Sequence, residues 1–150
     1  MERTLIIFKP DAMNRMLVGR ILTRFEEKGL RLAAMKMQRS PREQVERHYA
    51  VHKDRPFYSA LVEFMTAGPV ILAVLEGPQA IAVVRNLLGA TDGLVAAAGT
   101  IRGDFGLDVQ YNLVHASDAP ETASKEIELF FKPEELITWD RAPDRWIVSR

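Results

Sequence analysis

The stretch NLVHASDAPE, residues 112–121, places one histidine between an apolar run and a polar cluster. Asn112 lies three residues before His115, and Ser117 and Asp118 follow it. Neutral imidazole is nucleophilic at pH 7, so His115 is a candidate nucleophile. A single histidine at the end of a strand is, however, more often structural than catalytic. The stretch by itself leaves both interpretations open.

Several polar side chains lie in loops and at the ends of elements, where binding sites are usually built. Lys9 ends an apolar run, Arg55 lies in HKDRPF, and Arg85 lies on a predicted helix. Thr91 follows in a long loop, and Arg102 lies in GTIRGDFG, whose three glycines would let backbone approach a ligand closely. The spacing matches neither a Walker A loop nor a dinucleotide-binding fingerprint. Each cation alone is more typical of a solvated surface, so they do not identify a ligand.

The composition is that of an ordinary globular protein. Hydrophobic residues make up 47% of 150 residues and charged residues 27%, which suits one domain over residues 1–150. The 20 acidic and 20 basic residues balance, so nothing predicts a surface that coats nucleic acid or a membrane. The absence of cysteine excludes disulfides and thiolate metal sites. The apolar runs are too short for a signal peptide or a membrane span, so we expect a cytoplasmic protein.

Patterns of apolar residues predict the elements that must position these side chains. Short apolar runs predict strands at 4–9, 31–39, 69–76 and 112–117. Helical spacing and capping residues predict helices at 18–28, 41–50, 57–68, 79–89 and 121–131. Ser40 to Glu43 matches a capping box, whereas 90–111 and the C-terminal tail have little regular pattern. The βαββαβ order predicts an α+β, ferredoxin-like sandwich with an antiparallel sheet and helices on one face.

Motifs along nearly the whole chain resemble those of nucleoside diphosphate kinases. In order, they are ERTLIIFKPDA, RFEEKGLRL, HYAVHKDRPFYSALVEFMTAGPV, TIRGDFG and NLVHASDAPE. The resemblance runs from about residue 2 to about residue 136 and is specific, because several independent motifs agree. It implies a ferredoxin-like fold and a ping-pong transfer of the γ-phosphate through a phosphohistidine, with ATP and other nucleoside tri- and diphosphates as substrates.

The resemblance also implies a role for each matching position. His115 matches the nucleophile, and Glu126 matches the carboxylate that holds the imidazole nitrogen that is not phosphorylated. Phe57 and Val109 match the pair that encloses the base, which implies low base selectivity because every base has a π-face. The positions that match phosphate contacts are Lys9, Tyr49, Arg85, Thr91 and Arg102, and those that match ribose contacts are Asn112 and Lys9. The supporting positions are Arg55, Leu61, Ser117 and Asp118.

The metal implied by the resemblance is Mg²⁺ on the bound nucleotide. Phosphate oxygens would hold the ion, which keeps much of its water shell, and Asp118 matches a residue near it that acts through water. We expect no metal site made by the protein itself. Ser117 matches a hydrogen-bonding partner of Glu126.

The sequence departs from the family pattern at five positions: Met16, Gly93, Ala98, Ala116 and Ala119. Ala116 replaces a common glycine and would cost about 1 kcal/mol if its φ were positive. Ala119 removes a serine N-cap worth roughly 0.5–2 kcal/mol. Gly93 and Ala98 replace prolines, so we expect a mobile loop that Gly93→Pro would stabilise by roughly 0.4–1 kcal/mol if φ there is near −65°. No change removes a matched chemical group, so we expect an active enzyme.

Two functions other than nucleoside diphosphate kinase activity are alternatives for this sequence. A ferredoxin-like binding module that has lost phosphate transfer is disfavoured, because the matching set of reactive and cationic side chains is complete. A structural or regulatory partner protein that uses its oligomer surface stays open as a second role.

The C-terminal segment FKPEELITWDRAPDRWIVSR bears on assembly. Family members form oligomers built on a common dimer, and those with a longer C-terminal segment resemble hexamers rather than tetramers. The segment carries Trp139, Trp146 and Ile147 among charges and would expose aromatic surface if left free. We therefore expect a homo-oligomer, with a hexamer favoured over a tetramer and the tail packed across a neighbouring subunit.

Overall fold

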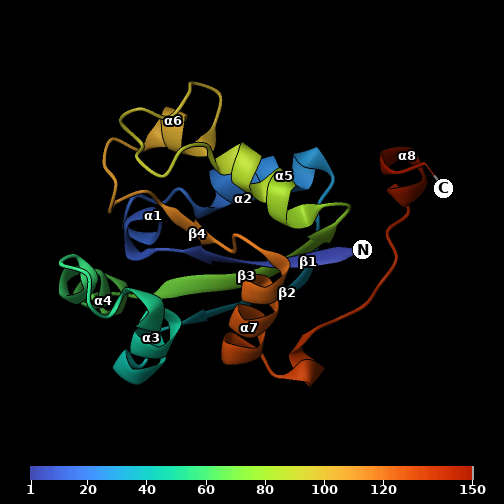
Figure 1. The fold of residues 1–150 in the computed structure, drawn as a ribbon. Coiled ribbons are helices and arrows are strands. Elements are labelled where there is room, and N and C mark those ends of the chain that lie inside the picture. Colours follow the sequence, from blue (N-terminus) through green and yellow to red (C-terminus); the bar gives the residue numbers. More distant parts are fainter. Residues whose placement is uncertain (150) are drawn as a thin grey trace.

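The computed structural model describes residues 1–149, and its centre is a four-stranded antiparallel sheet (Figure 1). The strands lie in the order β2-β3-β1-β4, and their bounds are β1 Glu2–Phe8, β2 Arg31–Gln38, β3 Val70–Gly77 and β4 Val114–Ala116. β1 pairs with β3 along its whole length and with β4 over its last three residues. The predicted α+β class and the antiparallel sheet are confirmed.

Helices cover both faces of this sheet (Figure 1). On one face lie α2 (Val18–Lys28) and α5 (Ala80–Leu88). On the other face lie α3 (Arg42–His48), α4 (Tyr58–Thr66) and α7 (Pro120–Phe130). The remaining short helices are α1 Pro10–Asn14, η1 Ala50–His52, α6 Ile101–Phe105, η2 Pro133–Glu135 and α8 Asp144–Ile147. Within residues 1–149, no helix combines the length and the apolar composition needed to cross a bilayer.

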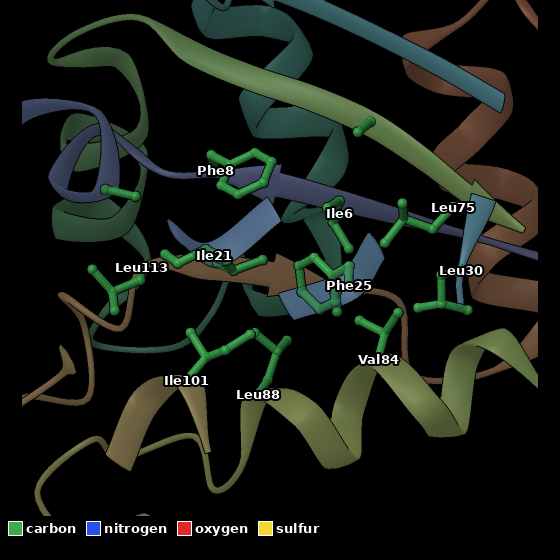
Figure 2. Close-up of a cluster of buried hydrophobic side chains, with 14 of the residues drawn as sticks. Ile6, Phe8, Ile21, Phe25, Leu30, Leu75, Val84, Leu88, Ile101 and Leu113 are labelled. Atoms are coloured by element: carbon green, nitrogen blue, oxygen red, sulfur yellow. The ribbon is translucent and has the colours of Figure 1, made fainter. Parts of the chain in front are cut away.

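Alternation along β1 explains why both faces are covered. Ile6 and Phe8 pack with the side chains of α2 and α5 (Figure 2), whereas Leu5 and Ile7 pack with those of α3, α4 and α7. A continuous apolar run is the pattern of a strand that is buried on both sides. The prediction that helices lie on one face holds for α2 and α5, the two helices of the βαββαβ core. It is wrong for α3, α4 and α7, which cover the opposite face.

Helix ends and loops account for most other differences from the predicted elements. Gly29 ends α2 with a φ of 108°, as the pattern predicts. The capping box at Ser40 does not form, because α3 begins at Arg42 and the Ser40 hydroxyl accepts a hydrogen bond from Gln38 instead. The segment 90–111 contains α6. Its N-cap is Thr100, whose hydroxyl accepts the Gly103 N–H. A five-residue helix is too short to show a clear 3.6-residue period.

The C-terminal tail runs along the free edge of β2 rather than away from its own chain. The Ile137 N–H donates to the Ala33 carbonyl at 2.8 Å, and the Trp139 indole donates to the Leu32 carbonyl at 2.8 Å. The Arg141 guanidinium donates to the carbonyls at 29 and 30. These bonds occupy part of an edge that would otherwise offer unpaired backbone groups. The part of the tail up to residue 141 therefore packs on its own subunit.

The positions that depart from the family pattern differ in their backbone conformation. Met16 has a φ of 55°, so this residue does occupy a conformation that favours glycine. Ala116 lies within β4 and has no positive φ, so alanine causes no backbone strain at this position. Ala119 is the N-cap of α7 and makes no side-chain capping bond, as expected.

The contacts of Gly93 contradict the expected increase in stability from Gly93→Pro. The Gly93 N–H donates to the Asp108 carbonyl at 3.1 Å, and a Cβ at Gly93 would lie 2.6 Å from the carbonyl carbon of Gly106. Proline would remove that donor and clash with Gly106. We predict that Gly93→Pro destabilises the protein by more than about 1 kcal/mol, measured by chemical denaturation. Gly93→Ala, which keeps the N–H, separates the clash from the lost bond, and a raised melting temperature for Gly93→Pro would contradict this account.

Candidate active site

A cavity of about 660 Å³ lies among α3, α4, α7, β4 and the loops around α6. This volume is in the range of small-molecule binding sites. The predicted site residues that line it are Lys9, Tyr49, Phe57, Leu61, Arg85, Thr91, Arg102, Val109, Asn112, His115, Asp118 and Glu126. Two predicted residues do not line it: Arg55 is exposed in the loop before α4, and Ser117 is buried beneath the cavity.

The Glu126 carboxylate on α7 lies at the centre of the site. Its Oε2 atom is 2.7 Å from His115 Nε2, and its Oε1 atom accepts a hydrogen bond from the Ser117 hydroxyl at 2.7 Å. The Ser117 hydroxyl also accepts the Leu5 N–H at 3.3 Å, which ties the pair to β1. Since Nε2 is the nitrogen that Glu126 holds, the other ring nitrogen of His115, Nδ1, is available for chemistry.

His48 is a member of this cluster that sequence reasoning missed. Its Nε2 atom contacts Glu126 Oε2 and lies 3.2 Å from His115 Nε2. Its side chain is only 2% exposed, and its ring lies 4.3 Å from the Tyr49 ring and 5.2 Å from the Phe130 ring, between centroids. The sequence feature that could have identified His48 is its position beside Tyr49 in the motif HYAVH, at the end of α3.

The same cluster is the one set of potential metal ligands found among residues 1–149. One ligand atom from each of His48, His115 and Glu126 lies within 4.8 Å of the others. In this structure the Nε2 atoms of both imidazoles lie on the Glu126 carboxylate. The carboxylate is therefore committed to the two imidazoles.

The ionisation of the central pair follows from its burial and its hydrogen bonds. Burial lowers the pKa of His115 to about 4, against the opposing effect of the Glu126 hydrogen bond. Burial opposes the ionisation of Glu126, but the hydrogen bonds from His115 and His48 hold its pKa well below the usual range. At pH 7 the imidazole of His115 is thus neutral and Glu126 is ionised. The carboxylate then accepts the Nε2 proton, which leaves the lone pair of His115 on Nδ1.

Five cationic side chains line the cavity, and three of them, Lys9, Arg85 and Arg102, are among the predicted phosphate contacts. Lys9 is 7% exposed and donates to the side-chain carbonyl of Asn112 at 2.8 Å, and burial, with the nearby charge of Arg102, lowers its pKa to about 8. Arg102 is 5% exposed, and its pKa is lowered to about 10 by burial and by the charge of Arg85. Arg85 donates to the Ala116 carbonyl at 3.3 Å from the exposed side of α5. The cavity therefore concentrates positive charge in a chain whose net charge is zero.

Side chains with free binding capacity complete the cavity. The Tyr49 hydroxyl is buried and has no hydrogen-bond partner within residues 1–149, and burial raises the pKa of Tyr49. Phe57 and Val109 are 47% and 56% exposed, and both present apolar surface to the cavity. Asp118 is exposed, and the Thr91 carbonyl accepts a hydrogen bond from the side chain of Asn112. The arrangement offers a neutral nucleophile, cations for an anion, and apolar surface for a flat ring.

Comparison with known proteins identifies the family of the chain. The family model described as nucleoside diphosphate kinase matches residues 2–136. The nucleoside diphosphate kinase of Archaeoglobus fulgidus is 54% identical over 149 residues, covering 99% of each chain. That of Pyrococcus horikoshii is 54% identical over 152 residues, covering 99% of this chain and 96% of the relative.

Solved structures give the same result. A halophilic nucleoside diphosphate kinase from Halobacterium salinarum, in complex with CDP, is 47% identical with a TM-score of 0.96 over 99% of both chains. A nucleoside diphosphate kinase family protein from Babesia bovis is 49% identical with a TM-score of 0.95, covering 99% of this chain and all of the other. Since the family model and these relatives each span nearly the whole fold, the chain belongs to the nucleoside diphosphate kinase family of phosphotransferases.

Proposed function

We propose that this chain transfers the γ-phosphate from a nucleoside triphosphate to a nucleoside diphosphate by a ping-pong mechanism, through a phosphate carried on Nδ1 of His115. The observation that carries the proposal is the 2.7 Å contact between Glu126 Oε2 and His115 Nε2. This contact fixes a neutral imidazole with its lone pair on Nδ1, inside a cavity lined by cations.

In the first half-reaction, the Nδ1 lone pair attacks the γ-phosphorus. The bond between that phosphorus and the β–γ bridging oxygen breaks, and its electron pair leaves with the nucleoside diphosphate. The Nε2 proton stays on the ring, and the positive charge that develops there is stabilised by the Glu126 carboxylate. In the second half-reaction, a terminal phosphate oxygen of another nucleoside diphosphate attacks the same phosphorus, and Nδ1 leaves.

Fixed donors stabilise the charge on the transferring phosphoryl group. The donors available for this role are Lys9, Tyr49, Arg85, Thr91 and Arg102. A guanidinium has five N–H donors, and Arg102 directs hydrogen bonds to three backbone carbonyls, which leaves donors for a phosphate. Lys9 and Asn112 bind the ribose hydroxyls in this proposal.

The base binds between Phe57 and Val109, with Leu61 beside them in the cavity lining. Both partners offer apolar faces rather than donors and acceptors, so we expect purine and pyrimidine nucleotides to be accepted. Mg²⁺ enters as part of the nucleotide substrate. Two carboxylates line the cavity among residues 1–149. Glu126 is committed to two imidazoles and Ser117, whereas Asp118 is exposed and fits a contact to that ion through water.

The nucleophile is tested by His115→Ala. We predict no phosphoenzyme after incubation with ATP and Mg²⁺ and no transfer to a diphosphate, with nucleotide binding largely retained because the cations remain. Intact-mass spectrometry and calorimetric titration measure the two properties. Turnover in this variant, after removal of contaminating kinase, would overturn the mechanism.

The buried ammonium of Lys9 predicts a dependence on pH. The pKa of Lys9 is about 8, so the ammonium is charged below that pH and its contact to the nucleotide is lost as the pH rises through it. We predict that kcat/KM falls on the alkaline side with a midpoint near 8, while His115 stays neutral and does not limit the rate at neutral pH. Lys9→Arg should move this midpoint upward. A midpoint that does not move in this variant would show that another group titrates.

A hexamer is proposed as the assembly. Two separate regions expose apolar side chains: Met35 and Met37 on β2 are 50% and 66% exposed, and Leu94, Val95 and Leu107 around α6 are 69%, 71% and 81% exposed. A tetramer or hexamer that is built on a common dimer needs two kinds of interface, and the two exposed regions fit this need. Chains of 16.9 kDa give about 101 kDa as a hexamer and about 68 kDa as a tetramer. Light scattering behind a sizing column should give the larger mass, and the smaller one would refute the hexamer.

The cytoplasmic location stays a prediction from the sequence.

A further inference from the structure

A strained turn directly precedes the reactive histidine. Leu113 has a φ of 76°, although it is not glycine and its side chain is fully buried. The Val114 N–H donates to the Asn112 carbonyl at 2.9 Å, which closes a three-residue turn around Leu113. A γ-turn with a positive central φ is rare and strained.

The turn changes the face on which the neighbouring side chains lie. In a regular strand, side chains alternate between faces, so residues three apart, such as Asn112 and His115, lie on opposite faces. Here the consecutive residues Leu113 and Val114 both pack in the cluster beneath α2 and α5 (Figure 2 shows Leu113 beside Ile101 and Ile21). Asn112 and His115 consequently both line the cavity. The strain at Leu113 is therefore what brings these two side chains into one site.

Strained backbone persists only where the surrounding contacts hold it. The Leu113 carbonyl accepts the Lys9 N–H at 2.9 Å. The Arg102 guanidinium spans the turn, donating to the Asn112 carbonyl at 3.2 Å and the Val114 carbonyl at 2.6 Å. The remaining polar group of the strained residue, the Leu113 N–H, donates to the carboxylate of Asp11 at 3.0 Å.

Asp11 differs from the other contacts because it lies outside the cavity. It is in the first turn of α1 and belongs to a shallow surface hollow with Asn14, Phe64 and Tyr111. Its Oδ1 atom is buried without a hydrogen-bond partner within residues 1–149, so its bond to Leu113 is made through Oδ2. A carboxylate that accepts a backbone N–H makes a charge-assisted bond, which is stronger than a neutral one.

We propose that Asp11 is a positioning residue for phosphate transfer: it holds the strained turn at Leu113 that directs Asn112 and His115 into the same cavity. Asp11 touches neither the nucleotide nor the reacting atoms. Without its carboxylate oxygen, the turn relaxes toward a negative φ, and both Asn112 and the ring of His115 move relative to the cavity. A displacement of about 1 Å at a reacting group is enough to slow a reaction by about a hundredfold.

The alternative is that Asp11 only stabilises the first turn of α1, and a matched control separates the two roles. Asp144 lies in the first turn of the short helix α8 and accepts the Arg141 N–H at 3.0 Å, remote in sequence from the reactive histidine. Asp144→Ala therefore removes a carboxylate that accepts a backbone N–H, together with its ion pairs to Arg141 and Arg31, without touching the turn. Asp11→Asn retains an oxygen acceptor in place of the carboxylate. If Asp11→Ala does not fold, Asp11→Ser takes its place, because its shortened side chain also removes the carboxylate.

The experiment measures the single-turnover rate of phosphoenzyme formation at saturating ATP and Mg²⁺, well below the melting temperature of every variant. We expect Asp11→Ala to be slower by about tenfold to a hundredfold, Asp11→Asn to recover to within about threefold, and Asp144→Ala to match the wild type. A wild-type rate in Asp11→Ala, or equal losses in the alanine and asparagine variants, would overturn the inference. The inference rests on the proposed function. Absence of phosphoenzyme in the wild type refutes that function, whereas equal rates of phosphoenzyme formation in the wild type and Asp11→Ala refute only the role of Asp11.

Discussion

The site depends on one carboxylate that serves three partners. Glu126 comes from α7, His115 from β4 and His48 from α3, so the hydrogen bonds of a single side chain join both sides of the cavity. Ser117 holds the remaining oxygen and itself accepts the Leu5 N–H from the central strand β1. A buried ionised carboxylate is costly unless its hydrogen-bonding capacity is used. Saturating that capacity keeps Glu126 charged, fixes the tautomer of His115 and locks the relative positions of three elements.

The neutral state of His115 is as important as its orientation. The pKa of His115 is lowered first by burial and then by the nearby charges of His48 and Lys9, so the ring stays uncharged in a cavity whose cations suit an anion. In the proposed function, the cavity thus combines attraction for an anion with a histidine that remains unprotonated at neutral pH.

Much of this arrangement could be predicted from the sequence, because its signals are local. The apolar runs of β1 and β3 and the periodic pattern of α2 with its terminal Gly29 correspond to the observed elements. Motif matching identified most of the side chains that line the cavity, although it identifies no contacts between them. His48 was missed because a histidine in a helix carries no periodic signal that separates a buried hydrogen-bonded ring from a surface one.

The remaining features arise from tertiary contacts that a pattern cannot contain. The run of residues 112–117 has the composition of a strand, yet only residues 114–116 pair, because Asp11, Lys9 and Arg102 hold Leu113 in a turn. Gly93 stands where the family pattern has proline, but its N–H donates to Asp108 and a Cβ at this position would clash with Gly106. The second helical layer was not predicted. The continuous apolar strands are the pattern of a sheet that is buried on both faces, but the order of elements along the chain does not say which face each helix covers.

The central claim concerns a single atom, Nδ1 of His115. Nuclear magnetic resonance of the phosphoenzyme, with ³¹P observed and the histidine ring labelled with ¹⁵N, identifies which ring nitrogen carries the phosphate. Because Glu126 holds Nε2, the account predicts a phosphate on Nδ1 alone. A phosphate on Nε2, or on a residue other than His115, would contradict it.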